Sequence, residues 1–126
     1  MVVSPSEQAV RNYFVGLGAA DAADFGALFS DEVKFTDPVG QPTLEGPDGV
    51  ARFHKGLRRA WTSLEMTPQH VFVRGRRATA YWRASGQSAT GKDIEFDGIN
   101  VFELAEDARI ERVDGYWDFE GVISRM

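Results

Sequence analysis

The sequence predicts an α+β fold in which helices cover one face of a mostly antiparallel sheet. Apolar residues recur at helical spacing through most of the first 60 residues, whereas beyond about residue 64 they alternate with polar residues along four successive segments. Helices and strands that are separated in this way along a chain are typical of α+β folds. Because 126 residues is the size of one domain, we expect residues 1–126 to form a single domain.

Two helices are expected at the start of the chain. Residues 4–7, Ser-Pro-Ser-Glu, form a capping box with proline at the first helical position, and the apolar stripe that follows ends near Gly18. Asp21 is expected to cap a second, short helix, with Ser30 and Asp31 closing it.

The remaining elements are one strand, one helix and four strands. Alternation over residues 33–37 predicts the first strand, residues 38–42 form a turn, and a third helix starts at residues 46–48. The predicted order is therefore α-α-β-α-β-β-β-β. The last four strands, joined by hairpins, are expected at Met66–Val73, Arg77–Ser85, Ile94–Leu104 and Ile110–Phe119.

Composition excludes several kinds of chemistry. The chain has no cysteine and two histidines, so it has no thiol nucleophile and no cysteine-bound metal. Its formal net charge of −5 argues against nucleic-acid binding. Because no apolar run is long enough for a membrane span or a signal peptide, we expect a cytoplasmic protein that binds no membrane.

Asp37 is the first candidate for a catalytic residue. Alternation places its carboxylate on the same strand face as Val33 and Phe35, the face that should be covered. Burial would raise the pKa of this carboxyl group, as a general base working near neutral pH requires. The alternative is that Asp37, next to Pro38, is an ordinary aspartate that caps a turn.

Tyr13 and Asn100 are candidate hydrogen-bond donors. Tyr13 lies on the apolar stripe of the first helix, and Asn100 shares a strand face with Phe96 and Phe102. Each polar group either reaches a cavity or has a partner inside the core.

The two histidines do not form a metal site. His54 lies on the apolar side of the third helix beside Phe53, and His70 is 16 residues further along the chain, so we expect no bound metal. Asp118 alternates with Tyr116 on the face of the last strand opposite Trp117.

Four segments resemble the ketosteroid isomerases of the nuclear transport factor 2-like (NTF2-like), or SnoaL-like, superfamily. They are Val10–Tyr13 with its continuation to Ala20 and Asp21, Ala27–Ser30, the Asp-Pro-Val-Gly segment Asp37–Gly40, and Gly49–Phe53. The resemblance implies a curved, cone-shaped sheet with three helices packed over its concave face. It also implies a homodimer, no cofactor, and an apolar small-molecule substrate such as a steroid- or polyketide-like ketone.

The resemblance also implies roles for individual residues. Asp37 matches the catalytic base, and Tyr13 matches the tyrosine that donates to the enolate oxygen. Asn100 stands where the isomerases have a protonated aspartic acid, and as an amide it can still donate one hydrogen bond. His54 stands where some members have a tyrosine that supports the donor network. Further pocket-lining residues are expected at Phe53, Phe102, Trp117 and Asp118.

The expected function is therefore the isomerisation of a double bond in an apolar ketone. Asp37 would move the proton, and Tyr13 and Asn100 would stabilise the enolate oxygen. Two alternatives remain. One is a cyclase or dehydratase that uses Asp118, because residues 116–118 resemble a motif of SnoaL-like polyketide cyclases. The other is a domain that binds apolar small molecules without catalysis.

Overall fold

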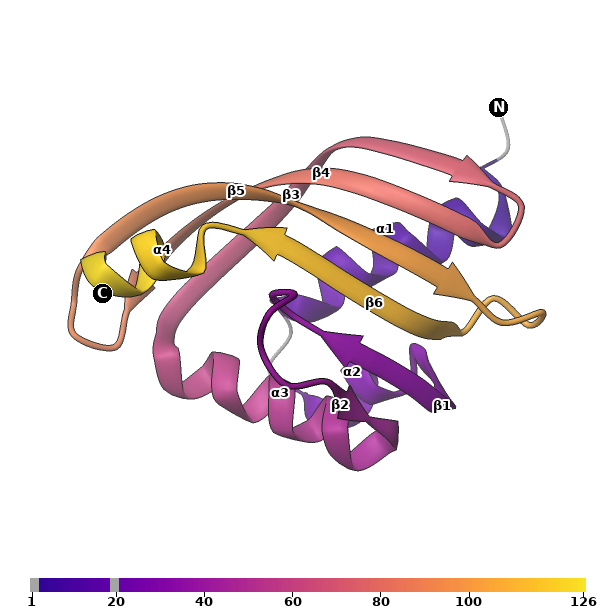
Figure 1. Cartoon of the computed structure of the whole chain (residues 1–126), viewed down its shortest axis with the longest axis horizontal. Helices are drawn as coiled ribbons and strands as arrows, with labels where there is room; N and C mark the ends of the chain where they lie inside the picture. Colours follow the sequence, from indigo (N-terminus) through magenta and orange to yellow (C-terminus); the bar gives the residue numbers. More distant parts are fainter. Residues whose placement is uncertain (1–2, 19–20) are drawn as a thin grey trace.

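The computed structural model describes residues 3–18 and 21–126, and it is built around one six-stranded sheet (Figure 1). The strands are arranged in the order β2-β1-β6-β5-β4-β3, and only the β1–β6 pair is parallel. The helices are α1 Pro5–Leu17, α2 Ala22–Gly26, α3 Gly46–Ala60 and α4 Phe119–Arg125. The strands are β1 Phe29–Thr36, β2 Leu44–Glu45, β3 Trp61–Arg74, β4 Arg77–Ser88, β5 Asp93–Leu104 and β6 Ile110–Trp117.

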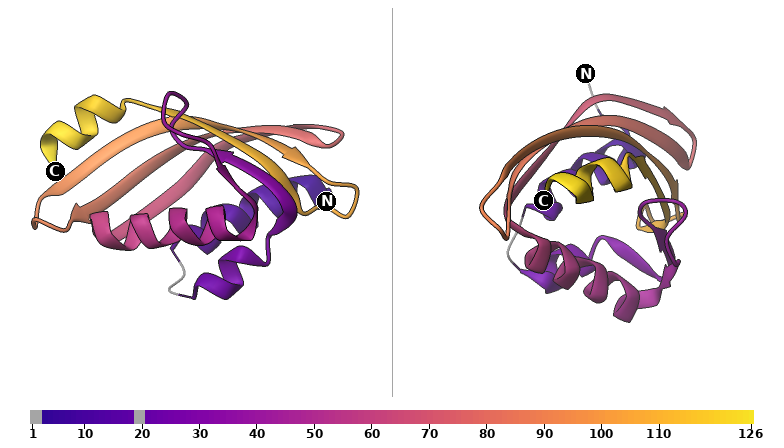
Figure 2. Two further views of the ribbon diagram at one scale, coloured as in Figure 1. Left: turned by 60° about the horizontal axis from the view of Figure 1, so that its bottom comes forward. Right: turned by 60° about the vertical axis from the view of Figure 1, so that its left-hand side comes forward.

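The sheet curves around α1, α2 and α3, which lie on its concave side, whereas α4 lies near the end where β5 begins (Figure 2). This confirms the predicted α+β class and the cone-shaped arrangement. No helix in the described part of the chain is long and apolar enough to cross a membrane.

Aromatic side chains fill the space between the helices and the sheet. Tyr13 is completely buried, and its ring centre lies 5.1 Å from those of Phe14 and Phe102. Phe25 on α2 and Phe35 on β1 complete this cluster around the tyrosine. The contacts with Phe14 and Phe102 are edge-to-face and those with Phe25 and Phe35 are tilted, and together they pack α1 against α2, β1 and β5.

The first helix follows its predicted signals. Ser4 caps α1, its side chain accepts a hydrogen bond from the backbone N–H of Glu7 at 3.1 Å, and the helix ends before Gly18. Asp21 caps α2 by accepting from the N–H groups of residues 23 and 24.

The predicted end of the second helix is wrong. Helix α2 ends at Gly26, and Ser30 and Asp31 belong to β1. The chain leaves the helix early because Phe29 pairs with Ile110 of β6, and the Ile110 N–H donates to the carbonyl of residue 28 at 2.9 Å. Pairing between distant strands therefore outweighs the local helical pattern.

Two elements are missing from the predicted order, and several strands have different limits. Strand β1 begins at Phe29 rather than at residue 33, and β4 continues to Ser88 rather than ending at Ser85. The two-residue strand β2 forms by pairing with β1, and α4 begins at Phe119, where the last strand was expected to continue. Strand β3 begins at Trp61, directly after α3, because residues 61–65 pair with the end of β4. A register shift between Trp61 and Ser63 leaves two exposed polar residues, Thr62 and Ser63, in succession, so the alternating pattern is broken in this segment.

Candidate functional site

Asp37 follows the last residue of β1 and is held by a tryptophan of β6. The indole Nε1 of Trp117 donates to Oδ1 of Asp37 at 2.7 Å. Backbone contacts fix this end of β1 against β6, because Thr36 pairs with Asp114 and the Val39 N–H donates to the Gly115 carbonyl at 2.7 Å. The carboxylate therefore has a defined position, with one oxygen already hydrogen-bonded.

Burial changes the acidity of this carboxyl group. It raises the pKa of Asp37 from 3.8 to about 6, because the charged form loses its hydration, and the hydrogen bond from Trp117 lowers that pKa by a smaller amount. At pH 7 most of the group is ionised, and it binds a proton much more strongly than an exposed aspartate does. These are the properties of a general base that works near neutral pH.

Asp37 lines a pocket of about 230 Å³ whose other walls are mostly apolar. Helix α3 contributes Phe53, Leu57 and neighbouring residues, and β6 contributes Trp117. The C-terminal residues 119, 123 and 126 close one side. The full set of lining residues is Asp37, Phe53, Gly56, Leu57, Ala60, Trp61, Trp117, Phe119, Ile123 and Met126. The carboxylate is the only ionisable side chain in this set.

Tyr13 and Asn100 form a pair inside the core. Both are completely buried, and Nδ2 of Asn100 donates to the Tyr13 hydroxyl over a long 3.5 Å. The Asn100 oxygen Oδ1 accepts a hydrogen bond from Nε1 of Trp82 at 3.0 Å. Burial, and to a smaller extent the charge of Asp37, raises the pKa of Tyr13 well above its usual value, while Asn100 lowers it. Tyr13 is therefore protonated at neutral pH and is able to donate.

Gly115 brings the two polar groups together. It pairs with Asn100 across β5 and β6. A Cβ atom at position 115 would collide with the Asp37 carboxylate and would lie 3.1 Å from Oδ1 of Asn100. Asp37 and the Asn100 amide therefore both lie close to one glycine.

The other predicted site residues lie at different depths. Phe53 and Trp117 line the pocket. Phe102 is completely buried against Tyr13, and His54 is buried on α3 with its ring centre 5.5 Å from that of Phe25. Asp118 is exposed and caps α4, accepting from the Gly121 N–H at 3.1 Å. Neither Tyr13, Asn100, His54, Phe102 nor Asp118 belongs to the lining set given above.

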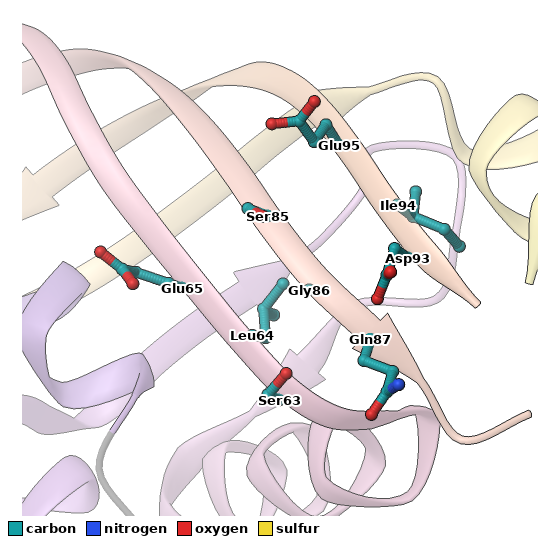
Figure 3. Close-up of a pocket in the computed structure, with 9 residues that line it drawn as sticks. All are labelled: Ser63, Leu64, Glu65, Ser85, Gly86, Gln87, Asp93, Ile94 and Glu95. Carbon is teal, nitrogen blue, oxygen red and sulfur yellow. The ribbon is translucent and has the colours of Figure 1, made fainter. Parts of the chain in front are cut away.

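A larger depression lies elsewhere, over β3, β4 and β5 (Figure 3). Its volume is about 710 Å³, and Glu65, Ser85 and Glu95, which stand next to one another in register, line it together with neighbouring residues. These three residues are exposed on the outer face of the sheet. Among the described residues, no group of three or more His, Cys, Asp or Glu side chains is arranged to hold a metal ion. We therefore place the candidate site at Asp37.

Sequence reasoning missed Trp82, Gly98 and Gly115. Trp82 occupies one face of β4 between Ala80 and Ala84, and this run of small residues around one large residue is visible in the sequence. Its contact with Asn100 depends on the register of β4 against β5, which the sequence pattern does not give. The part of the pocket wall formed by α4 was also missed, because no helix was predicted there.

Comparison with known proteins identifies the family. A family model described as a SnoaL-like domain matches residues 10–113. No curated protein matches the chain significantly.

Solved structures share the fold at low sequence identity. An NTF2-like protein of unknown function from Burkholderia pseudomallei is 18% identical, with a TM-score of 0.86 over 98% of each chain. The epoxide hydrolase/cyclase-like enzyme SalBIII, described for its role in pyran ring formation in the polyether salinomycin, is 18% identical with a TM-score of 0.82, covering 91% of this chain and 92% of its own. TerC, co-crystallised with polyporic acid, is 14% identical with a TM-score of 0.84, covering 97% of this chain and 98% of its own. With its cone-shaped sheet and the family match over residues 10–113, the chain belongs to the SnoaL-like domain family of the NTF2-like superfamily.

Proposed function

We propose that the protein is a cofactor-independent isomerase that moves a proton between two carbons of a small apolar ketone. The observation that carries this proposal is the Asp37 carboxylate, which has a pKa of about 6 and is the one ionisable side chain in the wall of an apolar pocket. Such a wall can hold a hydrocarbon skeleton while the carboxylate reaches a C–H bond beside the carbonyl.

The reaction needs one base used twice. The Asp37 carboxylate removes a proton from the carbon between the carbonyl and an isolated double bond, leaving an enolate with its charge on oxygen. The protonated Asp37 then returns the proton to the far carbon of the double bond, which becomes conjugated with the carbonyl. No electrons leave the substrate, so no redox cofactor takes part.

Tyr13 and Asn100 are the proposed donors to the enolate oxygen. The tyrosine hydroxyl is protonated, and the amide keeps its NH₂ group at every pH, so both are able to stabilise a developing negative charge. Because both residues are completely buried, the proposal requires the pocket to deepen towards them when a ketone binds.

The volume of the pocket limits the size of the substrate that it can hold. About 230 Å³ is below the range of roughly 300–1,000 Å³ that is usual for small-molecule sites. A ketone with one or two rings therefore fits the pocket better than a four-ring steroid.

The test is a set of β,γ-unsaturated ketones of increasing size. We expect the protein to convert 3-cyclohexen-1-one into its conjugated isomer, followed by the ultraviolet absorbance of the product, and to turn over a four-ring steroid ketone more slowly. Absence of turnover for every ketone in the set would overturn the proposal.

A second candidate function is the binding of apolar small molecules without catalysis. The observation that favours it is that Tyr13 and Asn100, the proposed donors, lie outside the lining of the pocket. Saturated ketones that raise the melting temperature, together with no turnover of the unsaturated ketones, would favour this candidate.

We further propose that the protein forms a homodimer through the outer face of its sheet. Phe72, Ile99 and Tyr116 are 67%, 46% and 51% exposed on this face, and Ile99 pairs directly with Tyr116 across β5 and β6. A second copy of the same face would cover these side chains, as in most two-fold symmetric dimers.

A further inference from the structure

The orientation of the Asn100 amide follows from the chemistry of its neighbour Trp82. The indole N–H of a tryptophan only donates, so the atom that it faces at 3.0 Å must be an acceptor. That atom is Oδ1 of Asn100, and the NH₂ group of the same amide must then point the other way. Both side chains are buried, so no bulk water replaces this contact.

This orientation decides how Asn100 meets Tyr13. The NH₂ group faces the tyrosine oxygen at 3.5 Å and only donates, so the tyrosine oxygen acts as the acceptor. The hydroxyl proton of Tyr13 is therefore not used by Asn100. In the reversed orientation, the amide oxygen would face Tyr13 and would accept that proton.

The position of Trp82 is itself fixed by its surroundings. Gly98 stands opposite Trp82 on one side and Trp117 on the other. A Cβ atom at Gly98 would lie 2.5 Å from the Trp82 ring and 2.9 Å from Cβ of Trp117. Phe96 packs edge-on against Trp82 with ring centres 5.6 Å apart. Gly98 thus makes room for two indoles: that of Trp82, which donates to Asn100, and that of Trp117, which donates to Asp37.

We propose that Trp82 is a positioning residue that holds the Asn100 amide with its NH₂ group towards Tyr13, so that the Tyr13 hydroxyl keeps its proton for the oxygen of a bound ketone. The consequence for a ketone rests on the proposed function, whereas the amide orientation does not. Trp82 acts through Asn100 and lies outside the lining of the Asp37 pocket.

The first test is spectroscopic and needs no substrate. Trp82→Phe keeps an aromatic ring and removes the N–H donor. In the wild type we expect nuclear Overhauser contacts between the Asn100 NH₂ protons and the Tyr13 ring, and in Trp82→Phe we expect these contacts to be lost as the amide turns. The matched control is Tyr81→Phe, which removes the 2.8 Å hydrogen bond to Asp97 from the opposite face of the same strand and should leave the contacts intact. Unchanged contacts in Trp82→Phe would overturn the proposal.

The second test is kinetic. We expect Trp82→Phe to lower kcat for 3-cyclohexen-1-one by about 10–100-fold with little change in KM, the size of effect seen when a hydrogen-bond partner that orients a metal ligand is lost. Because Trp82 acts through Asn100, Trp82→Phe should have no further effect in an Asn100→Leu background. Additive effects of the two changes, or an effect on KM alone, would overturn the proposal.

Thermal melting of each variant separates loss of folding from loss of orientation. If the wild type turns over no ketone, the proposed function fails, and the Overhauser contacts still decide the orientation of Asn100.

Discussion

Burial disfavours the charged form of Asp37 and brings the pKa of its carboxyl group closer to neutral pH. Its pKa rises from 3.8 to about 6 on folding, so the folded state binds the proton more tightly than the unfolded state does. Stability from this group is therefore present at low pH and is lost as the pH rises from about 4 to about 6. The shift corresponds to a cost on the order of 3 kcal/mol at neutral pH. The fold therefore keeps in its pocket a carboxyl group whose charged form is destabilised by burial.

The hydrogen bond from Trp117 sets how far this pKa rises. Trp117→Phe removes a donor that stabilises the ionised carboxylate, so we expect the pKa of Asp37 to increase. The inflection in the pH profile of kcat/KM should move to higher pH, with activity still increasing as the pH rises through it.

Trp61→Phe is the matched control for this shift. Trp61 also lines the pocket, and the structure gives it no hydrogen bond to Asp37, so its replacement should leave the inflection where it is. An inflection that is the same in Trp117→Phe and in the wild type would show that the indole does not act on the carboxylate.

Candidate site residues could be selected from the sequence more readily than the contacts that these residues make. Asp37 and Tyr13 could be selected because a polar side chain stood on an apolar face of a strand or helix. The depth of Asn100 and its bond to Trp82 could not be predicted, since both depend on the register between β4 and β5 and on how far the sheet curves.

At the scale of elements, strand β6 supplies both the Trp117 side chain that donates to Asp37 and, at Gly115, the space that the Asp37 carboxylate occupies. Gly115→Ala adds a methyl group that collides with the carboxylate. We expect a loss of activity of about 100-fold, the effect that a displacement of roughly 1 Å can have on a reacting group. Steady-state kinetics should show this while circular dichroism shows a folded protein.

Gly26→Ala is the control for added volume, because a Cβ atom there meets nothing within 4 Å. It should leave kcat and KM unchanged. If Gly115→Ala were as active as Gly26→Ala, the carboxylate would not need the position described above.

Helix α4 tests the alternative role of Asp118. The side chain of Asp118 caps this helix, and asparagine caps helices about as well as aspartate does. We expect Asp118→Asn to keep both the melting temperature and the turnover of 3-cyclohexen-1-one. A loss of activity in Asp118→Asn larger than that in Asp37→Asn would favour a reaction that uses Asp118.

Helix α4 also shows why one element was not predicted from the sequence. The capping contact of α4, from the Gly121 N–H to Asp118, is as local as that of α1, but Asp118 and Phe119 also continue the alternating pattern of β6, so the strand was predicted to run on to Phe119. The start of α1 was predicted correctly because no strand pattern runs into its capping residue Ser4.

At the scale of the whole molecule, the sheet has one face covered by helices and one face whose exposed side chains include Phe72, Ile99 and Tyr116. Ile99→Lys places a charge on this face in each copy of a symmetric dimer. We expect light scattering at micromolar concentration to show a dimer mass for the wild type and a monomer mass for Ile99→Lys.

Val15→Lys is the control for surface charge, because Val15 is 77% exposed on α1, away from the outer face of the sheet. It should remain dimeric. A monomer mass for the wild type would contradict the dimer.

The overall architecture was the most predictable level of this protein. Four long alternating segments and three helical ones are enough to indicate an α+β layer, and the curved sheet with helices on its concave side confirms it. The pocket was less predictable because α3, β6 and α4 all contribute to its wall, and their approach depends on the curvature of the sheet.

The central claim is that Asp37 is the base, and kcat/KM of the wild type and of Asp37→Asn for 3-cyclohexen-1-one tests it most directly. We expect the wild-type value to rise with pH to a plateau, with an inflection near the pKa of about 6. Asp37→Asn should lose about 10²–10⁴-fold in rate and the inflection with it, because the amide cannot take the proton. An unchanged rate in Asp37→Asn, or a wild-type profile without the inflection, would contradict the account.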